Sequence, residues 1–187
     1  DLGGPRLELG HRDAARRAAD FVLTRMRRPD GGLWRTHKDG RARHFGVLDD
    51  YAFVVQALLD TYEATGEIRW INAAIELQRY ADENFFDTEA GGYFATGHTH
   101  EALLTRTRPL YDGAEPSATS VTTRNLIRLS QLVNDPQHLA RAQRTFERYG
   151  PELGRVARVM PLMLGNVALW HGRRTEIVLV GTPDSPD

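Results

Sequence analysis

The stretch "HFGVLDDYAFVVQALLD" (residues 44–60) joins polar side chains to a long apolar run, and it decides the fold class. Apolar residues occur on nearly every side of a helical period over residues 50–65, which predicts a helix buried on all sides. One of the two adjacent aspartates, Asp49 and Asp50, is expected to be the N-cap, because helices favour aspartate there. A cap needs only one carboxylate. The second carboxylate, Tyr51 and His44 are therefore candidates for a functional site.

Five further segments have the apolar periodicity of helices. The six predicted helices span residues 11–28, 50–65, 68–85, 117–133, 134–149 and 156–170. The first, third and fifth are amphipathic and are expected on the outside, whereas the second, fourth and sixth are expected on the inside. Pro161 must start or kink the sixth helix. The apolar run "EIVLVG" (residues 176–181) follows and predicts a short strand.

An internal repeat supports this alternation. "GGLWRT" (residues 31–36) recurs as "GGYFAT" (residues 91–96), and each copy stands between an amphipathic helix and a more apolar one. The repeated unit is therefore a helical hairpin with a loop, and stacked hairpins are typical of helical toroids and solenoids. The predicted fold class is all-α, with helical hairpins that form about half of an (α/α)6 toroid and a short β-type segment at the C-terminus.

The predicted domain organisation follows from the same pattern. Residues 1–174 are expected to form the partial α/α toroid, and residues 175–187 are expected to be the short strand and tail of an incomplete C-terminal appendage. The chain opens at Asp1 and closes on "GTPDSPD", so we expect it to be part of a longer protein. The remaining hairpins would then lie on that longer chain or on a partner.

Composition excludes several classes of function. The chain has 187 residues, 41% hydrophobic and 26% charged, with a net charge of −1, so neither nucleic acid nor a membrane is expected as a partner. It has no cysteine, which excludes disulfides, thiolate metal sites and a cysteine nucleophile within it. No apolar run approaches the length of a membrane-spanning helix. A cytoplasmic location is expected.

Two long loops carry most of the chemistry. Asp49 and Asp112 precede apolar helices and stand about one repeat apart. Because adjacent helices pack roughly 8–10 Å apart, these carboxylates could face one cavity. That separation overlaps the gap of roughly 6.5–9.5 Å between the two carboxyl groups of an inverting glycosidase. His44 is an alternative acid–base group, and the better one for an epimerase.

Other loop residues are candidates for binding a sugar. The predicted substrate-binding residues are Trp34, Tyr51, Tyr93 and Tyr111 for stacking, Arg108 for an anionic group, and Glu115, Ser117 and Ser120. Structural roles remain open for several of them: Asp112-Gly113 is a turn signal, Ser117 could cap its helix, and Trp34 could only pin its loop. "HTHE" (residues 98–101) hints at a metal, but HxH alone lacks the spacing of a full ligand set. No metal or cofactor is expected.

Three stretches resemble one known family: "FGVLDDYAFVVQALLDTYEATGEIRWINAAIEL", "FFDTEAGGYFAT" and "TRPLYDGAEPSATSVTTRNLIRLSQL". The chain is similar to thioredoxin-fold plus six-hairpin proteins, labelled spermatogenesis-associated thioredoxin-like or N-acylglucosamine 2-epimerase-like. The resemblance covers residues 14–181. Its LDDYA motif matches residues 48–52, and its DGA-x-PSGNS motif matches Asp112, Gly113, Ala114, Pro116, Ser117 and Ser120. The chain departs from the second motif at Ala118 and Thr119, where the family has Gly and Asn.

The resemblance implies a thioredoxin-like domain followed by an (α/α)6 toroid, of which this chain matches the C-terminal part. Relatives of that fold imply a carbohydrate-active protein, either a glycoside hydrolase or a sugar epimerase, with a sugar or sugar acid as ligand. The candidate catalytic residues are Asp49, Asp50, Asp112 and His44. The alternative is a non-catalytic binding or scaffold module that partners the thioredoxin-like domain.

Overall fold

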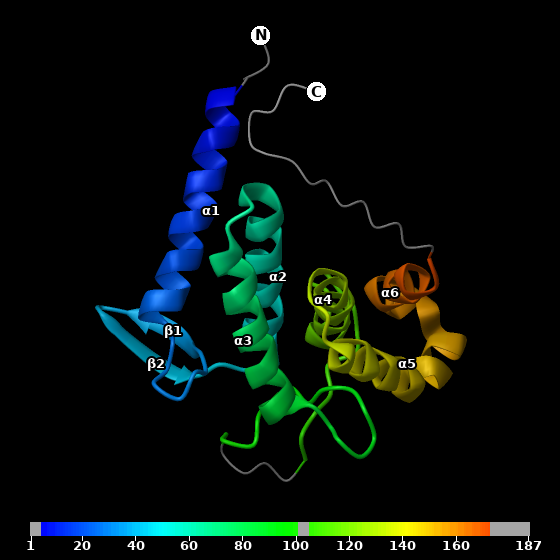
Figure 1. The fold of residues 1–187 in the computed structure, drawn as a ribbon. Helices are drawn as coiled ribbons and strands as arrows, with labels where there is room; N and C mark the ends of the chain where they lie inside the picture. Colours follow the sequence, from blue (N-terminus) through cyan, green and yellow to red (C-terminus); the bar gives the residue numbers. More distant parts are fainter. Residues whose placement is uncertain (1–4, 101–104, 173–187) are drawn as a thin grey trace, which may run out of the picture.

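The computed structural model describes residues 5–100 and 105–172, which are mostly helical (Figure 1). The elements are α1 (Pro5–Arg25), β1 (Trp34–Lys38), β2 (Arg41–Phe45), α2 (Leu48–Thr65), α3 (Ile68–Phe85), α4 (Ala118–Leu132), α5 (Pro136–Val156), the 3-10 turn η1 (Ala157–Val159) and α6 (Pro161–His171). The predicted strand at residues 176–181 lies outside the described residues. None of the described helices is both long and apolar enough to cross a membrane.

The helices are arranged as neighbouring pairs. The apolar helices α2, α4 and α6 follow one another in contact, while α3 packs on α2 and α5 packs on α4 (Figure 1). Helix α1 lies against the other side of α2. Helices α2 and α4 thus each contact a hairpin partner and the next apolar helix, as stacked hairpins require.

The core lies mainly between α2 and α3. Leu58, Leu59, Trp70 and Leu77 are at most 1% exposed, and each such burial stabilises the fold by roughly 1.5–3 kcal/mol. The prediction that α2 is buried on all sides is wrong along one face, which exposes residues 57, 60, 63 and 64.

Helix α6 is also less buried than predicted. Among its residues only Met163 and Asn166 are fully buried, whereas Leu164 and Leu169 are 49% and 37% exposed. Pro161 starts the helix, as one of the two predicted alternatives required, because a proline at the first helical position loses no hydrogen bond. Composition alone overstates burial here, since one face of α6 has no neighbour among the described residues.

Several helix boundaries depart from expectation: α1 begins at Pro5 rather than residue 11, α2 at Leu48 rather than residue 50, and α6 at Pro161 rather than residue 156. Two helix ends also differ. Helix α1 ends at Arg25 rather than Arg28, because the chain turns there into an antiparallel bridge between Arg27 and Leu33. Helix α5 was expected to end at Tyr149 but continues through Pro151 to Val156. Its last turns pack on a second apolar cluster, so tertiary contacts outweigh the cost of the internal proline.

The loop after α1 contains a β-hairpin that the sequence analysis did not predict. Strands β1 and β2 pair antiparallel, with Trp34 opposite Phe45 and Lys38 opposite Arg41. The two connecting residues, Asp39 and Gly40, have φ of 51° and 72°, as a type I′ turn requires. The Asp-Gly signal was present, but the segment has too few apolar residues to show a strand alternation.

The repeated GG motifs form two similar turns. Gly31 and Gly91 have φ of 89° and 79°, which glycine adopts without strain. An antiparallel bridge closes each turn, between Arg27 and Leu33 and between Phe86 and Tyr93. The second turn encloses one residue more than the first, and its second glycine, Gly92, also has a positive φ, of 77°. The internal repeat is therefore a structural repeat.

The second glycine of each motif allows a tyrosine to approach the backbone. A Cβ atom at Gly32 would lie 2.7 Å from the Tyr80 ring and hydroxyl, and one at Gly92 would lie 2.8 Å from the Tyr149 hydroxyl. Both distances are too short for any other residue. The role of the GG pairs is thus to fix each loop on the helices.

Tyr51 anchors the first loop. Its buried hydroxyl accepts a hydrogen bond from the Leu33 N–H at 2.8 Å, and its ring stacks on Tyr80 with centroids 5.3 Å apart. We expect Tyr51→Phe to lower the free energy of unfolding by about 1–2 kcal/mol, because the buried N–H loses its acceptor. Urea denaturation measures this. Tyr111→Phe is the matched control, since Tyr111 is 68% exposed and its removal should cost nothing measurable. Equal effects of the two variants would contradict the anchoring role.

Candidate functional site

A cavity of about 420 Å³ opens at the N-terminal end of α2. Its wall comes from the end of α1, strand β1, the first turns of α2 and the segment before α4. The residues with functional chemistry among its lining are Trp34, Arg35, Asp49, Asp50, Phe53 and Glu115. Three carboxylates, one guanidinium and an indole therefore meet in one place, which makes this cavity the candidate site.

The first turn of α2 holds its two aspartates differently. Val47 is the N-cap, so the expectation that Asp49 or Asp50 fills this position is wrong. The Asp50 Oδ2 atom instead accepts the Val47 N–H from the third helical position, at 2.8 Å. Asp49 makes no side-chain hydrogen bond with any described residue and lies half-buried at the cavity. One carboxylate thus supports the helix and the other is free for a ligand.

Burial raises the pKa of Asp50 above its ordinary value. The Val47 N–H, the Arg35 guanidinium and the charge of His100 act in the opposite direction, and the negative charge of Asp49 adds to the increase. The Arg35 Nη1 atom lies 4.0 Å from Asp50 Oδ2. Asp50 therefore keeps its proton to a higher pH than an exposed aspartate.

The sequence analysis did not predict two residues that lie near the site, Arg35 and His100. Arg35 was not singled out, because its segment was interpreted as a loop and not as strand β1. His100 belongs to the "HTHE" motif, which hinted at a metal. In the structure its charge instead acts on the pKa of Asp50. Its Nδ1 atom accepts the Gly97 N–H at 3.0 Å, and its ring lies between Phe45 and Phe85, with centroids 6.0 Å from each.

Asp112 does not border the cavity. It is 7% exposed, and its two oxygens accept three backbone N–H groups: Ser117 at 2.8 Å, Leu162 at 2.9 Å and Met163 at 3.2 Å. It thereby joins the start of α4 to the start of α6. The structure gives Asp112 a capping role, and Glu115 stands in its place as the carboxylate that lines the cavity from this loop.

The predicted aromatic platform is reduced to one ring. Tyr51 and Tyr93 are at most 1% exposed and hold the core, Tyr93 by donating a hydrogen bond to Asp82 at 2.5 Å. Tyr111 is exposed and does not line the cavity. Trp34 does line it, with its ring tilted against Phe45 at a centroid distance of 5.6 Å.

The other predicted residues have structural partners or lie elsewhere. Arg108 donates to Asp87 and covers the Phe94 ring at 4.0 Å, so it is not free for an anionic ligand. Ser117 caps α4, as proposed from sequence, and its Oγ atom accepts the Ser120 N–H and donates to the Ser120 hydroxyl. His44 is exposed on β2 with φ of 60°, outside the cavity lining.

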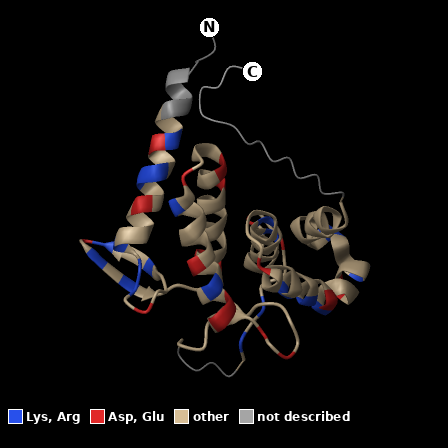
Figure 2. Cartoon of the chain, viewed as in Figure 1, with Lys and Arg blue, Asp and Glu red and all other residues tan. Residues whose placement is uncertain are grey.

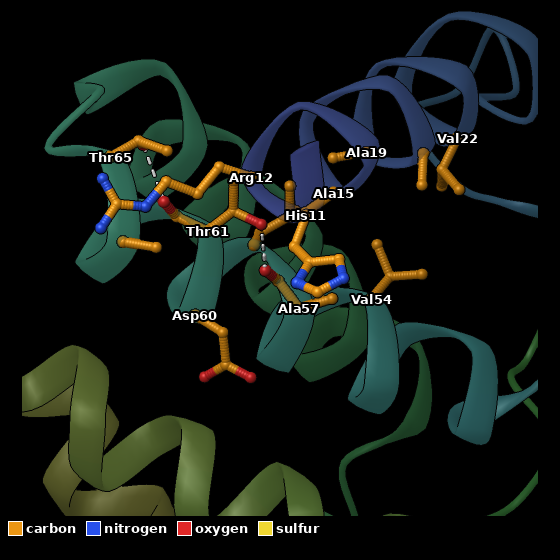
Figure 3. Close-up of a pocket in the computed structure, with 13 residues that line it drawn as sticks. His11, Arg12, Ala15, Ala19, Val22, Val54, Ala57, Asp60, Thr61 and Thr65 are labelled. Atoms are coloured by element: carbon orange, nitrogen blue, oxygen red, sulfur yellow. Dashed lines mark hydrogen bonds between the residues drawn. The ribbon is translucent and has the colours of Figure 1, made fainter. Parts of the chain in front are cut away.

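A second hollow, of about 480 Å³, lies between α1 and α2 (Figure 3). Its walls are mainly apolar and alanine-rich. The Thr61 hydroxyl donates to the Ala57 carbonyl of its own helix, and the Asp60 carboxylate is 2.8 Å from an Arg128 nitrogen. These two polar groups already have partners, and most of the remaining lining is apolar, so the larger hollow offers less chemistry than the smaller one.

The charges around the candidate site have a simple distribution. The β1–β2 hairpin carries mostly Lys and Arg, whereas the start of α2 carries acidic side chains (Figure 2). Within residues 5–100 and 105–172, no three His, Asp or Glu side chains are grouped as ligands for a metal ion.

The fold and the cavity together define a protein of stacked helical hairpins with a carboxylate-lined site at the mouth of one apolar helix. No family model matches the chain. It is 36% identical to spermatogenesis-associated protein 20 of Rattus norvegicus and 34% identical to that of Homo sapiens, each over 76% of this chain, and 36% identical to an uncharacterised protein of Caenorhabditis elegans over 73%.

These similarities support the assignment of the chain to the spermatogenesis-associated protein 20 family, to which the sequence motifs also pointed. The matched region makes up 18% of the length of each relative.

The capping role of Asp112 can be tested by stability. We expect Asp112→Asn to lower the free energy of unfolding by about 2–3 kcal/mol, because the amide nitrogen repels an N–H group that the carboxylate accepted. Asp49→Asn is the matched control, and it should change stability by less than about 0.5 kcal/mol. Both are measured by urea denaturation. A neutral Asp112→Asn would return this residue to the list of candidate catalytic groups.

Asp82, on α3 and outside the lining of the candidate site, is another carboxylate with a raised pKa. Burial raises its pKa to about 6, although Tyr93 and Gln78 donate hydrogen bonds to it and Arg141 lies 3.4 Å away. The folded protein therefore binds this proton more tightly than the unfolded chain, whose aspartate has a pKa near 3.8.

This shift gives a signed pH dependence. The stabilisation from the Asp82 proton is complete below pH 3.8 and is lost as the pH rises through about 6. Asp82→Asn keeps an acceptor for Tyr93 but cannot ionise. We expect the wild type to lose stability relative to this variant between pH 4 and pH 7, as measured by urea denaturation at each pH. A difference that does not change with pH would contradict the raised pKa.

Proposed function

We propose that the cavity at the start of α2 binds a carbohydrate. One observation carries this: a single cavity combines the exposed part of an indole ring with three carboxylates, two of which have no hydrogen-bond partner among the described residues. Sugars present an apolar face that stacks on aromatic rings and hydroxyl groups that donate to carboxylates. Trp34 supplies the first contact, and Asp49 and Glu115 supply the second.

The same groups could perform acid–base chemistry. In the proposed hydrolase, Asp50 donates its proton to the leaving oxygen, and Asp49 or Glu115 accepts a proton from the attacking water. In the proposed epimerase, a carboxylate removes the proton from the carbon next to a carbonyl, and a protonated group returns it on the other face. The raised pKa of Asp50 suits the donor in either reaction.

We also propose that the described helices form part of an (α/α)6 toroid, and that the rest of the ring and a thioredoxin-like domain belong to the longer protein. The pairing of α2 with α3 and of α4 with α5, and the two similar GG turns, support a repeated hairpin architecture. The relatives are much longer than the matched region, so they have chain enough for the remaining hairpins.

A non-catalytic binding module is the second candidate. It is favoured by Asp112, whose oxygens are occupied by three backbone N–H groups, so the pair of carboxylates predicted from the sequence is not available. In this alternative the cavity binds a ligand or a partner domain and catalyses no reaction.

Substitution of Asp50 tests the catalytic proposal. Asp50→Asn keeps an oxygen that can accept the Val47 N–H, so the start of α2 is preserved, but it cannot donate a carboxyl proton. We expect the turnover of this variant to be 10²- to 10⁴-fold lower than that of the wild-type chain. The assays are release of a phenol from aryl glycosides and, for epimerisation, exchange of a sugar C–H proton in D₂O followed by NMR.

Asp60→Asn is the matched control, because Asp60 lies on the same helix outside the cavity. Sugar binding by a wild type without turnover would favour the binding module over the enzyme. Absence of both binding and turnover would overturn the carbohydrate proposal.

A further inference from the structure

The charge of the cavity is not balanced by its own residues. The Asp49 and Glu115 carboxylates face one guanidinium, from Arg35, and Asp50 adds a further negative charge only where it is ionised. Arg35 is 49% exposed and 4.0 Å from Asp50, so it offsets part of one of these charges. The cavity therefore attracts a positively charged group and repels an anion.

The partners of these carboxylates strengthen the argument. Asp50 is engaged by the Val47 N–H and by Arg35. Within residues 5–100 and 105–172, the Asp49 and Glu115 carboxylates form neither a hydrogen bond nor an ion pair, although other acidic side chains of the chain are paired with arginines. Two carboxylates without cations in one lined cavity are suited to a cation that comes with the ligand.

The aromatic side of the cavity also favours a cation. Indole is the ring that binds cations most strongly through its face. Trp34 lines the same wall as Arg35, and the Arg28 guanidinium already lies over its ring, 5.5 Å from the centroid. The residue that the sequence offered for an anionic ligand, Arg108, is bound to Asp87 and stacked on Phe94. No described arginine other than Arg35 lines the cavity.

We propose, building on the carbohydrate site above, that its ligand is an amino sugar with a free, protonated amine, and not a sugar acid. The ammonium group donates hydrogen bonds to Asp49 and Glu115, and the apolar face of the sugar ring stacks on Trp34. Charge-assisted hydrogen bonds of this kind are about twice as strong as neutral ones. Acetylation of the amine removes its charge, so the cavity discriminates free from acetylated amines.

The test compares five ligands on the full chain by isothermal titration calorimetry. Four share the sugar ring: glucosamine has an ammonium group at C2, N-acetylglucosamine and glucose are neutral, and glucuronate has a carboxylate at C6. The fifth, n-propylammonium, has the cation without the sugar. We expect glucosamine to bind at least ten-fold tighter than the acetylated and neutral sugars, and glucuronate to bind most weakly. Raising NaCl from 20 mM to 500 mM should weaken glucosamine alone, because salt screens the charge interaction.

Variants assign the effect to the cavity. Glu115→Gln and Asp49→Asn should each reduce the preference for glucosamine over N-acetylglucosamine several-fold. Glu83→Gln is the matched control, because Glu83 is an exposed carboxylate on α3, paired with Arg79 and outside the cavity, and the preference should not change. Thermal melting of each variant checks that it is folded.

The outcomes separate this inference from the proposed function. Equal binding of glucosamine and N-acetylglucosamine, or tighter binding of glucuronate, would overturn the amine preference and leave a sugar site standing. Binding of n-propylammonium as tight as that of glucosamine would overturn the carbohydrate proposal, and with it the amino sugar as ligand, but leave the preference for a cation. Binding of none of these ligands would overturn both.

Discussion

The hydrogen bond from the Leu33 N–H to the Tyr51 hydroxyl holds the loop region of this protein on its helical core. The Leu33 carbonyl also accepts the Gly46 N–H at 2.8 Å, so this one buried residue is tied both to α2 and to the end of the hairpin. Trp34 and Arg35 follow it directly. Their positions at the cavity are therefore set by a contact inside the core, and a buried anchor of this kind gives a binding wall the rigidity that loops otherwise lack.

Much of the helical framework could be predicted from the sequence, because apolar periodicity and capping are local properties. Helix α3 begins and ends where its pattern placed it, and Ser117 caps α4 as its position before an apolar run suggested. The GG repeat also indicated correctly that two segments share one role. The exposed faces of α2 and α6 could not be predicted, since burial depends on which other elements cover a helix.

The candidate site was only partly predictable, for a related reason. Asp49 and Asp112 stand about one repeat apart in the sequence, but separation along the chain does not fix the direction of a side chain in a loop. Asp112 turns toward the backbone of α6, which is distant in sequence, while Glu115 lines the cavity. Arg35 was hidden because its strand is short and polar, and a hairpin of this kind has only its turn residues as a signal.

Both GG turns are closed by an antiparallel bridge, begin with a left-handed glycine and bring their second glycine against a tyrosine, yet the loops that follow them differ in length and structure. The helices and their GG turns are thus independent of the loop that follows each turn. A segment inserted between the turn and the next apolar helix can be exchanged without disturbing the hairpin beneath it. Such a scaffold can acquire new ligands by replacing one loop at a time, which makes the span from Trp34 to Phe45 a natural unit for grafting.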